Sequence, residues 1–61
     1  MDGQKITIDE LLDKGYVKDE EIGIVDVYCK EHSWGKKVIF YYRKREEVAK
    51  SMRVPKEDYR L

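Results

Sequence analysis

Two side chains near the middle of the chain could in principle carry nucleophilic or metal chemistry. Cys29 and His32 are the only cysteine and the only histidine. Three residues apart in an extended strand, they lie roughly 10 Å apart along the chain and point to opposite faces. A metal site needs three or four converging ligands, and the carboxylates show no such spacing. We therefore predict no catalytic residue, no metal, no cofactor and no small-molecule substrate: the protein is not expected to be an enzyme.

Aromatic and basic residues are the stronger candidates, because they are suited to binding a partner. Tryptophan is enriched in binding hot spots, and one at a hairpin tip either folds back onto the sheet or faces a partner. Basic side chains interleaved with aromatic ones can also follow phosphates and stack bases. However, the isoelectric point of about 6.6 falls short of the basic character expected of a nucleic-acid binder. The predicted partner-binding residues are Trp34, Lys36, Lys37, Tyr41, Arg43, Lys44 and Arg45.

These residues support two functional hypotheses. The first is a small, non-catalytic binding module that acts through protein–protein contact by its β-hairpin, as an accessory protein, an inhibitor or a homodimer. The alternative is a nucleic-acid-binding protein that uses the basic C-terminal half together with the hairpin aromatics. The first hypothesis suits a net charge of zero. The second predicts an affinity that falls strongly with salt.

Charge is unevenly distributed along a chain that is expected to form a single small domain over residues 1–61. Residues 1–31 sum to −5 and residues 32–61 sum to +5. This asymmetry indicates either an electrostatic role or a fold that brings the halves together so that their charges pair. The chain also has no asparagine, a single glutamine and 43% charged residues, a composition typical of thermophile proteins.

Nothing in the sequence predicts a membrane or secretory destination. No apolar run approaches the roughly 18 residues of a spanning helix, and no signal peptide is recognisable. A lone cysteine cannot form an intramolecular disulfide, and Cys29 is expected to be a small buried apolar residue. We therefore expect a cytoplasmic protein without a membrane partner.

The central element is predicted to be an antiparallel β-hairpin over residues 22–43. Two runs rich in Val, Ile, Tyr and Phe flank a turn that ends in Gly35. A three-residue loop with a bulge pairs residues whose numbers sum to 68, and a loop without the bulge pairs those that sum to 67. On either register both faces of the hairpin carry apolar side chains. Such a sheet needs cover on both faces, or cover on one face and a partner on the other.

The flanking segments are predicted to be short helices joined to the hairpin by connections. Thr7 and Glu10 match a capping box, and Gly15 suits a helix end, so the first helix is expected over Ile8–Lys14. Residues 18–21 are expected to be a charged connection. Residues 44–53 contain good helix formers with a short apolar stripe, which predicts a second helix. The predicted fold class is therefore α+β, with an N-terminal helix, a central hairpin and a C-terminal helix.

The alternative for residues 45–53 is a strand. The tail from Val54 to Tyr59, with Pro55 within it, resembles the closing turn of SH3-like barrels, including small archaeal chromatin proteins. The resemblance implies a strand over residues 46–54 and a small SH3-like β-barrel. A third strand would need a turn near residues 43–45, where the sequence has no Gly, Asn, Asp or Pro to signal it.

Overall fold

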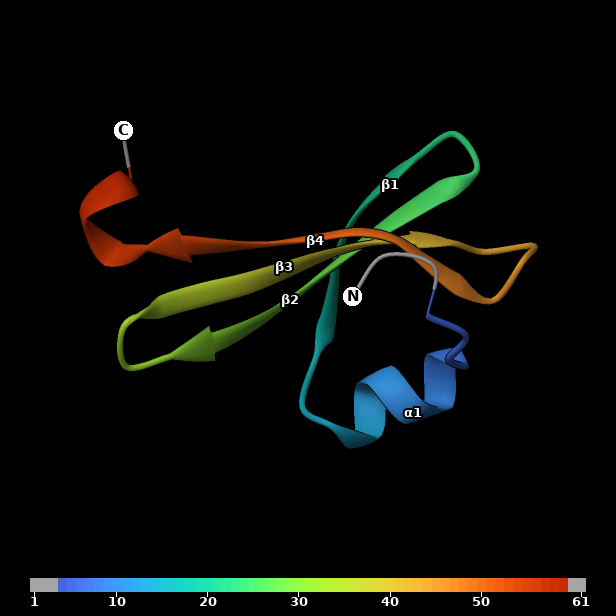
Figure 1. Cartoon of the computed structure of the whole chain (residues 1–61), viewed down its shortest axis with the longest axis horizontal. Helices are drawn as coiled ribbons and strands as arrows, with labels where there is room; N and C mark the ends of the chain where they lie inside the picture. Colours follow the sequence, from blue (N-terminus) through green and yellow to red (C-terminus); the bar gives the residue numbers. More distant parts are fainter. Residues whose placement is uncertain (1–3, 60–61) are drawn as a thin grey trace.

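A computed structural model describes residues 4–59 and shows a four-stranded antiparallel sheet with one short helix on one side (Figure 1). The strands follow one another in the order of the sequence, so the sheet is a meander with β1 and β4 at its edges. The elements are α1 (Ile8–Asp13), β1 (Val17–Ile22), β2 (Val25–His32), β3 (Gly35–Tyr42), β4 (Glu47–Pro55) and the 3₁₀ turn η1 (Lys56–Asp58).

The predicted hairpin is confirmed as β2 and β3, and its register is the one without the bulge. His32 pairs with Gly35 and Val25 with Tyr42, so paired residue numbers sum to 67. Gly35 has φ +150°, and a Cβ at this position would overlap the carbonyl oxygen of Val54. Only glycine therefore lets β4 approach the start of β3 so closely.

The prediction of a C-terminal helix is wrong, because residues 47–55 form β4, which pairs with β3. Helix propensity is a weak local preference, whereas a strand here satisfies the row of backbone groups that β3 would otherwise expose. Glu46 makes the preceding turn possible by adopting φ +51°, which is uncommon for a residue other than glycine. The sequence contained no recognisable signal for that turn.

The predicted α+β class is therefore replaced by a mostly β fold with one helix and one 3₁₀ turn. Residues 18–21 belong to β1 and are not a connection; a bulge between Lys18 and Glu20 lets this charged strand pair with β2. The SH3-like alternative required a strand over residues 46–54, which is present. However, β1 and β4 remain opposite edges of an open meander and no barrel is formed by the described strands.

The helix begins as predicted. The side chain of Thr7 accepts from the Glu10 backbone N–H at 3.2 Å, and Glu10 accepts from the Thr7 N–H at 3.0 Å, which completes the capping box. Gly15 follows the helix with φ +97°. Because α1 has only six residues, it depends on packing against the sheet for its stability.

The core lies between α1 and one face of the sheet, which we call the covered face. Its buried members come from every part of the chain: Ile6, Leu11, Tyr16, Tyr28, Ile39, Tyr41 and Val48. Tyr41 is wholly buried, and its hydroxyl donates to the Ile6 carbonyl at 2.6 Å. Tyr16 belongs to this core, whereas its neighbour Val17 is 62% exposed.

Candidate functional site

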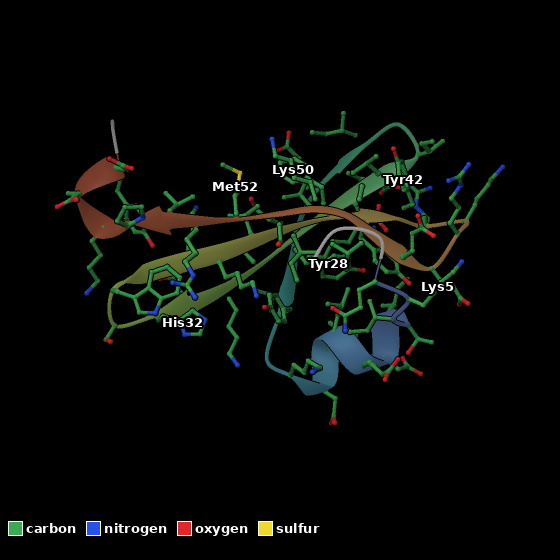
Figure 2. All side chains as sticks on the ribbon, in the orientation of Figure 1. Lys5, Tyr28, His32, Tyr42, Lys50 and Met52 are labelled. Carbon is green, nitrogen blue, oxygen red and sulfur yellow. The ribbon has the colours of Figure 1, made fainter. Side chains whose placement is uncertain are left out.

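The side of the sheet opposite α1 carries an apolar surface that no helix in the described part of the chain covers (Figures 1 and 2). We call it the open face. Cross-strand pairing assembles one of its rows from Val17, Cys29, Val38 and Met52. Figure 2 shows Met52 and Lys50 on this side and Tyr28 on the side of α1. Val27 and Val38 are nearly buried by their neighbours, whereas Val17 and Met52 are exposed. The sheet is therefore apolar on both faces but covered on only one of them.

A second row of the open face has opposite charges at its two ends. Glu20 on β1 pairs with Val27, Val27 with Phe40, and Phe40 with Lys50 on β4. The edge strand β1 thus presents an acid where the edge strand β4 presents a base. Such a row is complementary to its own reversed copy.

At the hairpin end, the chain following β4 folds toward the rim of the open face. The Lys36 ammonium lies 5.4 Å from the centre of the Tyr59 ring. The Tyr59 hydroxyl donates to Glu31 at 3.5 Å. Burial, followed by the nearby Glu31 carboxylate, raises the pKa of Tyr59. Lys36, a predicted partner-binding residue, is therefore part of the rim of the open face.

The covered face continues beyond α1 as a basic surface. Lys30 pairs with Lys37 and Lys37 pairs with Arg53, so three cations lie in one row across β2, β3 and β4. Lys14, at the end of α1, lines a hollow of about 100 Å³ together with Tyr16 and Lys37. We call Lys14, Lys30, Lys37 and Arg53 the basic face. None of them lies within 4.0 Å of a carboxylate among residues 4–59.

Flat side chains adjoin the basic face at the hairpin tip. The His32 and Trp34 rings are stacked, with their centres 4.7 Å apart and their planes 9° from parallel. The Arg53 guanidinium carbon lies 5.5 Å from the centre of the Trp34 ring. Trp34 is nevertheless 40% exposed. Trp34 thus folds back against His32 and Arg53 while part of its ring stays exposed.

The other predicted partner-binding residues are separated by the fold. Tyr41 is buried in the core. Arg43 is held in ion pairs with Asp26 and Glu21. Lys44 and Arg45 lie at the opposite end of the sheet from Trp34, where they line a cavity of about 300 Å³ with Ile24 and Tyr42. Of the predicted set, only Trp34 and Lys37 lie on or beside the basic face.

Sequence reasoning missed Lys14, Lys30, His32 and Arg53 as members of a shared surface. The register that sums to 67 would have placed Lys30 opposite Lys37. Arg53 could be found only by assigning residues 47–55 to a strand. Lys14 depends on where α1 packs, for which the sequence carries no pairing signal.

The remaining reactive groups show no catalytic arrangement. Burial, then the Asp19 carboxylate, raises the pKa of the Cys29 thiol, so the thiol stays protonated at neutral pH. Cys29 lies on the open face, whereas His32 stacks on Trp34 on the other side of the sheet. Within residues 4–59 no three His, Cys, Asp or Glu side chains gather to hold a metal ion. None of the helices in that range is long and apolar enough to cross a membrane.

No family model, no curated protein and no solved structure matches this chain.

Proposed function

We propose that this chain is a non-catalytic protein-interaction module whose open face packs against the open face of a second copy. The observation that carries the proposal is the apolar open face, which stays uncovered while the other face of the same sheet has a complete core. Two such sheets pack face to face about 10 Å apart with their strands nearly aligned. The second sheet would remove Val17, Met52 and their neighbours from water.

The charges at the two edges favour a second copy over an unrelated partner. A two-fold axis parallel to the strands, between β2 and β3, places β1 of one copy over β4 of the other. The row from Glu20 to Lys50 then meets itself in reverse. Glu20 faces the partner's Lys50, Val27 faces the partner's Phe40, and the same contacts recur on the other side of the axis.

Pairing through the sheet edges is less favourable. Two β1 edges would bring together the acidic run Asp19, Glu20 and Glu21, and like charges across strands are destabilising. The beginning of the β4 edge is already occupied. There the Ile6 N–H donates to Glu46 and the Val48 N–H donates to Gln4.

Light scattering coupled to size exclusion tests the proposal. We expect a dimer of twice 7.3 kDa at high protein concentration. Glu20→Lys or Lys50→Glu creates two like-charge contacts per dimer and should raise the dissociation constant on the order of tenfold. The double variant Glu20→Lys/Lys50→Glu restores both contacts with reversed sign and should recover the wild-type constant. Both positions are exposed, so neither change threatens the fold.

Met52→Lys provides a second variant, because it would place an unpaired charge inside the interface and should yield a monomer. Circular dichroism checks that this monomer is folded. Reaction of Cys29 with a thiol reagent supplies an independent readout, since association should slow the reaction as concentration rises. A wild-type protein that stays monomeric at all concentrations refutes the proposal. A dimer whose dissociation constant is unchanged in both Glu20→Lys and Lys50→Glu also refutes it.

A further inference from the structure

We infer that the basic face binds single-stranded nucleic acid, with phosphates at the cations and a base at the hairpin tip. The inference concerns the side of the sheet opposite the open face and does not depend on self-association. Figure 2 shows His32, at one end of this surface, on the same side of the sheet as α1.

The cations of the basic face have no carboxylate partner among residues 4–59, although Lys30 and Arg53 lie over the rings of Tyr16 and Trp34. Lys30 opposite Lys37, and Lys37 opposite Arg53, are like-charge pairs in direct cross-strand positions, which destabilise a sheet. Elsewhere in the described chain, Lys36, Lys44, Lys50 and Lys56 also lack a carboxylate within 4.0 Å, but they are not cross-strand neighbours of one another. Lys5, Lys18, Arg43 and Arg45 each lie within 4.0 Å of a carboxylate. A row of cations without internal counter-ions is the arrangement expected where an external polyanion binds.

The row of cations also has dimensions that suit successive phosphates. Neighbouring strands lie about 4.8 Å apart, so the backbone positions of Lys30, Lys37 and Arg53 span roughly 10 Å across the sheet. Flexible side chains on such a row can reach two or three successive phosphates. Lys14 and Lys37 converge on the hollow of about 100 Å³ beside Tyr16. At roughly 30 Å³ per water molecule, that hollow has room for about three waters, comparable to one phosphate group.

The aromatic residues at the hairpin tip favour a nucleic acid over other polyanions. Trp34 is partly exposed, stacks on His32 and lies beside Arg53. Bases stack on aromatic rings and on arginine planes, and this stacking tolerates any base sequence. A duplex keeps its bases stacked on one another, so only an unpaired base can use this site. A polyphosphate has no group that could benefit from the indole.

Intrinsic fluorescence tests the inference directly, because Trp34 is the only tryptophan. A short oligothymidylate titrated into the wild-type protein at low salt should quench this fluorescence. Three or four phosphate contacts predict that the logarithm of the binding constant falls with the logarithm of salt with a slope of about −2 to −3. The matched duplex and inorganic polyphosphate should bind more weakly and should leave the fluorescence unquenched.

Charge-matched variants distinguish the basic face from net charge. Lys37→Glu, at the centre of the row, should weaken oligothymidylate binding at least tenfold. Lys44→Glu makes the same change in net charge at the other end of the sheet and should leave binding unchanged. Trp34→Ala, followed by the anisotropy of a labelled oligonucleotide, should weaken binding to single strands but not to polyphosphate. Met52→Lys should bind as well as wild type even if it is monomeric.

Four results would overturn the inference. They are no binding of the oligonucleotide at low salt, equal losses in Lys37→Glu and Lys44→Glu, equal affinity for the duplex, and quenching that polyphosphate reproduces. None of these results bears on the oligomeric state, so failure here and failure of the proposed self-association can be told apart.

Discussion

Replacing Arg43 by alanine should strongly destabilise the protein, because it leaves the buried carboxylate of Asp26 without its main partner. Asp26 is only 1% exposed. The Arg43 Nε donates to both Asp26 oxygens at 3.2 Å, and its Nη2 donates to the Gly23 carbonyl at 2.7 Å. The same Nη2 lies 3.0 Å from Glu21. A single guanidinium therefore connects the β1–β2 turn, β1 and β2.

The size of the destabilisation depends on the partners that Asp26 keeps after Arg43 is removed. Breaking a fully buried ion pair costs about 3–5 kcal/mol. Here the Lys18 ammonium stays 3.9 Å from Asp26, and the Arg43 side chain is itself 36% exposed. Both features reduce the penalty, and we expect a loss of about 2 kcal/mol. In a domain of this size that corresponds to a fall in Tm of roughly 8–16 °C.

Urea unfolding followed by circular dichroism measures this loss, with Lys44→Ala as the control. Lys44 is the exposed neighbour of Arg43 and should change the free energy of unfolding by less than about 0.5 kcal/mol. In the double variant Asp26→Asn/Arg43→Ala, no buried charge is left unpaired. The loss of stability should therefore be smaller than the sum of the losses in the single variants Asp26→Asn and Arg43→Ala. An Arg43→Ala protein as stable as Lys44→Ala, or fully additive losses, would show that the ion pair contributes nothing.

Two further predictions concern the core and the hairpin. Burial, followed by the Glu46 carboxylate, raises the pKa of Tyr41 above 10.0. The folded state therefore holds this proton more tightly, so stability is full below pH 10 and falls as the pH rises through the raised pKa. Tyr41→Phe should weaken that alkaline loss, followed by urea unfolding from pH 8 to 12, but should cost about 1–3 kcal/mol at neutral pH because the Ile6 carbonyl loses its donor. Gly35→Ala should cost about 1–3 kcal/mol in urea unfolding. Gly23→Ala, also at positive φ but with open space around its Cβ, should cost less, and equal losses would exclude the overlap with Val54 as the cause.

The sequence was sufficient to predict elements that depend on local chemistry. The capping box at Thr7 and Glu10, the hairpin over residues 22–43 and the two apolar faces all follow from residue types a few positions apart. The hairpin register remained open between two sums, because a turn ending in glycine fits a loop with or without a bulge. In the folded protein His32 pairs with Gly35, which corresponds to the loop without the bulge.

The sequence was misleading wherever distant contacts outweigh local preference. Residues 47–55 contain good helix formers, yet the unsatisfied edge of β3 makes them a strand. In that strand Val48 enters the core while Met52 points to the open face, whereas a helix would place both on its apolar stripe. The basic face depends on this strand, because without β4 there is no Arg53 beside Lys37. Local propensity could therefore not reveal the candidate site.

The two explanations of the uneven charge, pairing between the halves and an electrostatic role, apply to different parts of the sheet. Near the ends of the strands, acids and bases from the two halves of the chain do pair. Arg43 pairs with Asp26 and Glu21, and Lys5 pairs with Glu47. The acids of β1 cannot pair with the bases of β4, because in this meander β2 and β3 lie between the two strands. The separation leaves opposite charges at the two edges of the open face and like charges along the basic face. Self-association would use the first pattern and a polyanion the second, so a dimer formed through the open faces would present one basic face on each outer side.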